Sequence, residues 1–148
     1  MQIVWMGQAG LLIDTGNIKI MVDPYLSDSV ARINPKNWRR VPVDEAFFRE
    51  EPDMIVMAGD MHDIRSFSHS FADLAEELGR KGVPLFFAEG NHDIKPKHRL
   101  EYEMFMKMLA ATGVTVLHHG KTYEVQRYGK TIPVCGVGWF DEGRDNVS

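Results

Sequence analysis

The sequence has one cysteine, no long hydrophobic run and no excess of basic residues, and each of these absences excludes a class of protein. Cys135 cannot form an internal disulfide, and since it lies in the apolar run 132–137 we expect a small buried side chain in a protein of a reducing compartment. No apolar run approaches the roughly 20 residues of a membrane span, and the first residues carry no basic leader. The formal net charge of -4 argues against nucleic-acid and membrane partners. We therefore expect a cytoplasmic protein.

The composition is that of a soluble globular chain, and 148 residues predict a single domain. Apolar segments at 2–6, 11–15 and 18–22, with the turn Gly16-Asn17, predict a small antiparallel sheet at the start. Residues 25–43 lose periodicity and predict a long surface loop, followed by a short helix with Asp44 as its N-cap. Arg39 and Arg40 in that loop are expected to be a solvated pair, with contact to an anionic substrate as the alternative.

Two polar clusters in the middle of the chain each follow an apolar strand. The strand at 54–58 ends in Gly59-Asp60-Met61-His62-Asp63, and the strand at 84–88 ends in Gly90-Asn91-His92-Asp93. If the helix between them forms a right-handed crossover, the strands are parallel and both clusters emerge at one edge of the sheet.

The side chains of these clusters suit metal and acid–base chemistry. Asp60 and Asn91 offer oxygen ligands for a divalent metal, His92 can donate a proton, and Asp93 can orient its imidazole. The alternative is that both clusters are strand-end turns, since Gly, Asn and Asp favour turns for backbone reasons.

Two helices are expected in this part of the chain. The first, at 70–82, buries a stripe formed by Phe71, Leu74, Ala75 and Leu78. The second, at 97–111, places Leu100, Met104, Met108 and Leu109 inward, as core rather than as a soft-metal site. A strand at 114–117 and a hairpin turning at Tyr128-Gly129-Lys130 follow, and residues 139–148 are expected to be a polar tail.

Residues 52–138 resemble the calcineurin-like metallophosphoesterases, because the GDxxD motif at 59–63 and the GNHD motif at 90–93 stand in the order of that family. The resemblance implies a two-metal centre in which Asp60 bridges both ions and Asn91 binds the second. We also expect Asp63 to be a metal ligand. His92, with Asp93, would assist the hydrolysis of a phosphate ester. The cofactor would be Mn, Fe or Zn.

Ligands that this resemblance calls for are missing from the chain. The first strand of the family ends in a D-x-H pair, whereas here it runs into Gly7-Gln8-Ala9-Gly10, and no GHxH motif follows the hairpin. His118-His119 stands at a strand end but matches neither motif. We therefore expect an incomplete two-metal site, and a catalytically silent fold that binds metal weakly or not at all remains the alternative.

Residues 1–53 resemble the start of metallo-β-lactamase-fold hydrolases of the ascorbate-phosphate lactonase type, through Gly7-Gln8-Ala9-Gly10, the hairpin and the segment 22–28. The HxHxDH motif of that family would fall on Gly59, Met61, Asp63 and Ile64, so its histidines are absent and a lactonase is a distant third hypothesis. The two resemblances together predict a chimera, natural or engineered, of the segments 1–53 and 54–138.

Both families build a four-layer αββα sandwich, and this chain has about half the length that such a sandwich needs. We therefore predict a mixed α/β fold that forms half of an αββα sandwich, with a mixed β-sheet and helices on one face. A half-sandwich leaves one apolar sheet face open, which predicts a homodimer that packs sheet on sheet.

Overall fold

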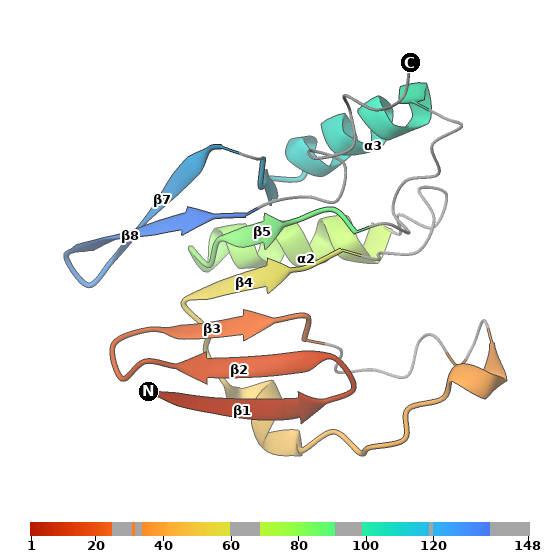
Figure 1. Ribbon diagram of the computed structural model, residues 1–148, viewed down its shortest axis with the longest axis vertical. Helices are drawn as coiled ribbons and strands as arrows, with labels where there is room; N and C mark the ends of the chain where they lie inside the picture. Colours follow the sequence, from red (N-terminus) through yellow and green to blue (C-terminus); the bar gives the residue numbers. More distant parts are fainter. Residues whose placement is uncertain (25–30, 32–33, 60–68, 91–98, 119, 137–148) are drawn as a thin grey trace. The chain divides into compact units, whose positions relative to one another are not determined.

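The computed structural model describes residues 1–24, 31, 34–59, 69–90, 99–118 and 120–136 (Figure 1). Two compact units make up the chain, Met1–Ile55 and Val56–Ser148. Six strands are hydrogen-bonded in the order β1-β2-β3-β4-β5-β6, and β7 and β8 form a second, two-stranded sheet. Antiparallel and parallel pairs both occur, which confirms the predicted mixed α/β fold.

The first unit opens with an antiparallel sheet of β1 (Gln2–Gly7), β2 (Gly10–Asp14) and β3 (Lys19–Val22). The turn between β2 and β3 is closed by a hydrogen bond from the Thr15 N–H to the Ile18 carbonyl, 3.0 Å long. Gly16 has φ +83°, a left-handed conformation that glycine adopts without strain. The predicted hairpin is therefore confirmed.

Two short 3-10 helices lie in the segment that follows, η1 (Pro35–Asn37) and η2 (Glu45–Arg49). The Asp44 side chain accepts a 2.9 Å hydrogen bond from the Ala46 N–H, which satisfies a donor at the start of η2. The predicted N-cap at Asp44 is confirmed.

Arg39 is not the solvated residue that the sequence predicted. Its side chain is only 9% exposed, with Nη2 donating to the Met6 carbonyl at 2.8 Å and Nε donating to the Val41 carbonyl at 2.6 Å. A guanidinium offers several donors in a fixed planar fork, so one side chain can bind carbonyls of two segments at once. Arg40, the next residue, is exposed as predicted.

Lys19 connects β3 to the segment that leads into β4. Its backbone N–H donates to Asp53 Oδ2 at 2.8 Å, and its Nζ lies 2.6 Å from Glu50 Oε2. The hydrogen bond from Lys19 to Glu50, and then their opposite charges, raise the pKa of Lys19 above 10.5. The pair therefore contributes stability below pH 10.5, and this contribution is lost as the pH rises through the raised pKa.

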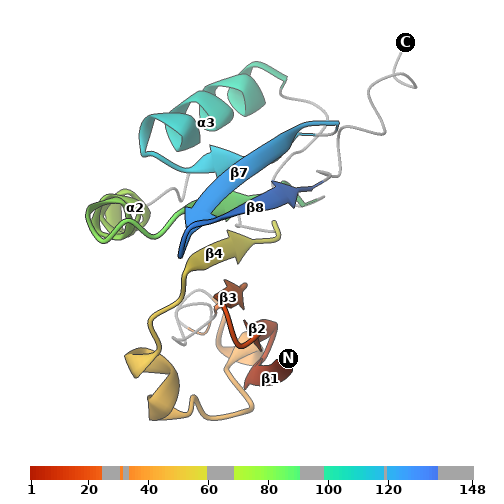
Figure 2. The same ribbon diagram turned by 90° about the vertical axis from the view of Figure 1, so that its left-hand side faces the viewer.

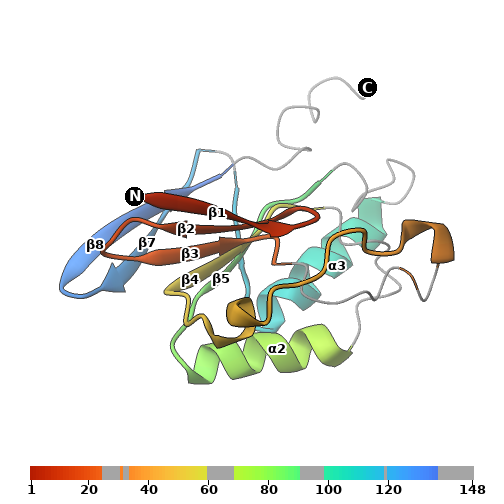
Figure 3. The same cartoon turned by 90° about the horizontal axis from the view of Figure 1, so that it is seen from below.

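The second unit contains parallel strands and two helices. β4 (Met54–Met57) runs into it, and β5 (Leu85–Phe87) pairs in parallel with β6 (Thr115–Val116). Helices α2 (His69–Arg80) and α3 (Arg99–Ala111) lie on the same side of β5 (Figures 2 and 3). All three residues of β5 are buried, as in strands that are covered on both faces.

Each helix buries fewer of its apolar side chains than the sequence predicted. In α2, Ala75 and Leu78 are buried but Leu74 is exposed. In α3, Leu109 is fully buried, whereas Leu100, Met104 and Met108 are exposed, so the predicted inward stripe is wrong at three of its four positions. Leu109 lies about 100° around the helix from Met108, and the helix meets its unit along the Leu109 side.

The strands β7 (Thr122–Arg127) and β8 (Lys130–Cys135) form the predicted hairpin. Tyr128 and Gly129 both have positive φ, at 50° and 71°, the pattern of a two-residue type I′ turn. The Tyr123 hydroxyl donates to the Val116 carbonyl at 2.7 Å, and the Tyr123 and Phe86 rings meet edge to face at a centroid distance of 6.5 Å. These contacts attach the hairpin to the parallel strands.

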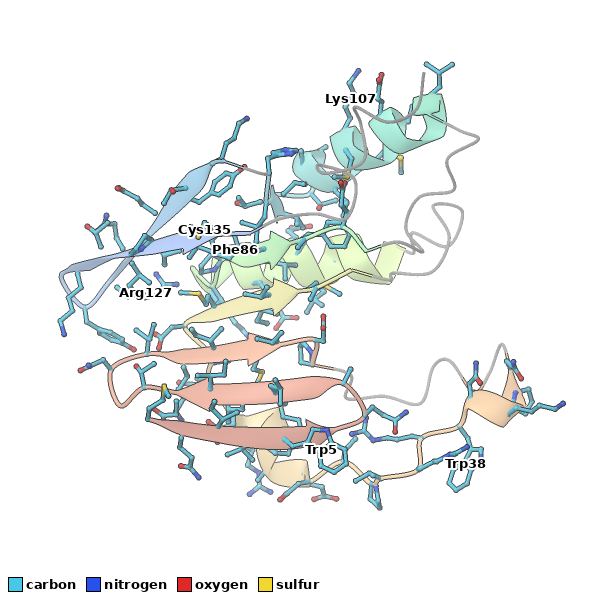
Figure 4. All side chains as sticks on the ribbon, in the orientation of Figure 1. Trp5, Trp38, Phe86, Lys107, Arg127 and Cys135 are labelled. Carbon is cyan, nitrogen blue, oxygen red and sulfur yellow. The ribbon has the colours of Figure 1, made fainter. Side chains whose placement is uncertain are left out.

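Cys135 is exposed, which corrects the predicted burial (Figure 4). Burial alternates along β8, where Ile132 and Val134 are half-buried and Pro133 and Cys135 are exposed. A strand in a two-stranded sheet has one face turned to solvent, so an apolar run does not bury every residue. Among the described helices, none has the length and the apolar character needed to cross a membrane.

Arg39→Lys is expected to destabilise the protein by about 1–3 kcal/mol, because an ammonium group cannot serve both carbonyls from one position and a buried acceptor is left unsatisfied. Urea denaturation followed by circular dichroism measures this change. Arg40→Lys is the matched control and is expected to change stability by no more than about 0.5 kcal/mol. Equal effects of the two substitutions would show that Arg39 has no structural role.

Candidate functional site

The candidate site is the edge of the second unit where β4 and β5 end. Both arrows run in the same direction in Figure 1, so the carboxyl ends of the two strands share one edge, as predicted. The Ala88 N–H donates to the Met57 carbonyl at 2.8 Å, which pairs the two segments immediately before their terminal glycines.

Gly59 and Gly90 touch at this edge. A Cβ atom on Gly59 would lie 2.2 Å from the Gly90 nitrogen and 2.5 Å from its Cα, closer than any side chain can approach a backbone. Gly59 also has φ +88°, which strains every other residue type. Both features require glycine, and together they confirm that the segments carrying the two predicted clusters converge.

Two described residues with metal-binding atoms stand at the same edge. Glu89 directly precedes Gly90 and is only 6% exposed. His118 is half-buried and follows Leu117, whose N–H donates to the Phe87 carbonyl at 2.8 Å, so this segment continues alongside β5. The sequence interpretation overlooked Glu89, although a carboxylate at the end of an apolar strand was a visible signal.

The predicted site residues themselves lie outside the described part of the chain. This applies to the metal ligands Asp60, Asp63 and Asn91 and to the catalytic pair His92 and Asp93. Within the described residues, no three His, Cys, Asp or Glu side chains are grouped closely enough to hold a metal ion. The assignments to these five residues therefore remain predictions.

A buried cation, the Arg39 guanidinium, lies at the end of β1. Gly7 has φ +86°, and a Cβ atom there would lie 2.6 Å from Arg39 Nη2. The buried guanidinium therefore occupies the space beside Gly7 and bonds the preceding carbonyl of Met6. A positively charged group at this position disfavours a metal ion beside it.

Gly59→Ala is expected to destabilise the protein by more than about 3 kcal/mol, because a left-handed φ costs roughly 1–2 kcal/mol and the clash with Gly90 adds to it. Gly113→Ala is the matched control, since Gly113 has nearly the same φ, +86°, and open space around its Cβ position. Thermal or urea unfolding compares the two variants. Equal destabilisation would show that the close approach of the strands adds nothing to the strain.

The comparisons with known proteins agree with the motif order. The family model for calcineurin-like phosphoesterases matches residues 28–146, a wider range than the 52–138 that carried the resemblance. The match includes residues 28–53, which were assigned to a metallo-β-lactamase-like segment, and no finding supports such a segment or a chimera. No curated protein matches the chain. Because the matched range covers most of the 148 residues, the chain belongs to the calcineurin-like phosphoesterase family.

Proposed function

We propose that the chain is a metal-dependent phosphoesterase whose site lies at the shared edge of β4 and β5. The observation that carries this proposal is the contact between Gly59 and Gly90, since it joins the two segments from which the GDxxD and GNHD motifs continue. The family match supports hydrolysis of a phosphate ester as the reaction class.

The proposal assigns roles by position in the two motifs. Asp60 directly follows Gly59, and Asn91 directly follows Gly90. Because these two glycines are in contact, each proposed ligand is one residue away from that contact. Asp60, Asn91 and Asp63 would hold the metal. A set of carboxylate and amide oxygens with imidazole nearby suits Mn, Fe or Zn.

The catalytic roles fall to His92 and Asp93. A divalent metal bound at this edge would supply positive charge to the phosphate oxygens. In the proposal, the His92 imidazole donates a proton to the leaving oxygen, and the Asp93 carboxylate orients that imidazole.

Metal content of protein purified without chelator tests the proposal directly. We expect near-stoichiometric Mn, Fe or Zn, which Asp60→Ala removes together with metal-stimulated hydrolysis of an aryl phosphodiester, because the carboxylate that would hold the metal is lost. Glu51→Ala removes an exposed carboxylate remote from these motifs in sequence and is the matched control. A folded, metal-free protein that gains no thermal stability from added Mn²⁺ or Zn²⁺ would instead support the catalytically silent alternative.

Glu89 extends the same proposal to a described residue. A carboxylate buried beside the metal either binds it or holds one of its ligands, so Glu89→Gln is expected to lower metal affinity by roughly 10–100-fold. Titration calorimetry with Mn²⁺ measures the affinity, and Glu76→Gln, an exposed position on α2, is the control. An unchanged affinity in Glu89→Gln would exclude this role and leave the roles of Asp60 and Asn91 intact.

A further inference from the structure

The sheet of the first unit has one face made only of apolar side chains, which we call the open face. It consists of Ile3, Trp5, Leu11, Ile13, Ile20 and Val22. The strand register aligns these residues in two rows across the three strands. One row is Ile3, Ile13 and Ile20, and the other is Trp5, Leu11 and Val22. Residues directly opposite each other in an antiparallel sheet project to the same side, so these six side chains share a face.

The other face of this sheet is already covered. Met6, Leu12 and Met21 are buried there, whereas Ile3 and Trp5 on the open face are 58% and 57% exposed. The other four side chains of the open face are half-buried. An antiparallel sheet with one solvated face normally alternates apolar and polar residues, but this sheet is apolar on both faces at its centre. Such a pattern is typical of a sheet that another layer covers.

Trp5 can be covered without losing a hydrogen bond. Its indole Nε1 donates to the Gln8 carbonyl at 3.0 Å, so the one polar group of the side chain is satisfied within the chain. Covering a tryptophan usually requires a partner for this N–H, and an unsatisfied donor would cost about 1–3 kcal/mol. The ring of Trp5 therefore offers apolar area with no such cost.

We propose that the open face binds the open face of a second copy of this chain, so that two sheets pack against each other around a twofold axis. A face without charged residues is complementary to itself, as an isologous interface requires, although the chain as a whole carries a net charge of -4. The packing places the two Trp5 rings in the interface, and sheets packed in this way lie about 10 Å apart.

The area available sets the expected affinity. Two exposed and four half-buried apolar side chains, at up to about 150–250 Å² for the largest of them, supply a few hundred Å² from each copy. Specific interfaces begin at roughly 600 Å² per partner. The open face supplies less than this, so the dimer is expected to be weak and transient, with a Kd on the order of 100 micromolar.

Sedimentation equilibrium of the full chain, from low to high micromolar concentration, tests the interface. We expect the mass to rise towards twice that of the chain, and Trp5→Lys to raise the Kd at least about tenfold because it removes the largest ring of the face and places a charge there. Trp38→Lys is the matched control, since Trp38 is 56% exposed but lies outside the open face, in the segment after η1 (Figure 4). It is expected to change the Kd by less than about twofold.

A fluorescence measurement keeps the test decisive if Trp5→Lys does not fold. The chain has three tryptophans, so the double substitution Trp38→Phe and Trp139→Phe leaves Trp5 alone. Its emission should move to shorter wavelength as the mass rises, because dimerisation buries the ring. A monomer at every concentration, a dimer that Trp38→Lys weakens as much as Trp5→Lys does, or Trp5 emission that stays constant while the mass doubles would each overturn the proposal.

Discussion

Two glycines in contact decide how the second unit is built. Because Gly59 lies against the backbone of Gly90, the segments after β4 and β5 begin within a few ångströms of each other, and no side chain can separate them. The contact depends on a left-handed φ at Gly59, on the parallel course of the two strands and on the hydrogen bond from Ala88 to Met57. The shared edge of the sheet, and with it the proposed site, follows from this approach.

In the first unit, a buried cation joins two segments of the chain. Arg39 draws the segment after η1 against the end of β1 by donating to the carbonyls of Met6 and Val41. The same guanidinium fills the space beside Gly7. One side chain thus holds two segments of its own unit together.

Family membership and site chemistry rest on different observations. The match over residues 28–146 identifies the chain as a calcineurin-like phosphoesterase, and the glycine contact supports the position of its two motifs. The buried side chain of Glu89 places carboxyl oxygens at that same edge.

Local patterns in the sequence correctly predicted the turns, the helix cap and the strands, because these depend on residues close together in the chain. The hairpins around Gly16 and Gly129, the cap at Asp44 and the parallel strands before the two motifs were all predicted, because turn conformations, capping hydrogen bonds and crossover handedness depend on nearby residues. The family was also evident from the order of two short motifs.

Only the tertiary structure decided which side chains are buried. The stripe of Leu100, Met104 and Met108 looks like core by its spacing, yet α3 meets its unit through Leu109, and Cys135 lies on the solvent side of a two-stranded sheet. Arg39 and Glu89 are charged residues that sequence patterns assign to the surface, but both are buried, and Arg39 donates to the carbonyls of Met6 and Val41. Periodicity determines that a helix or strand has an apolar side. Which neighbour covers that side depends on contacts between residues far apart in the chain.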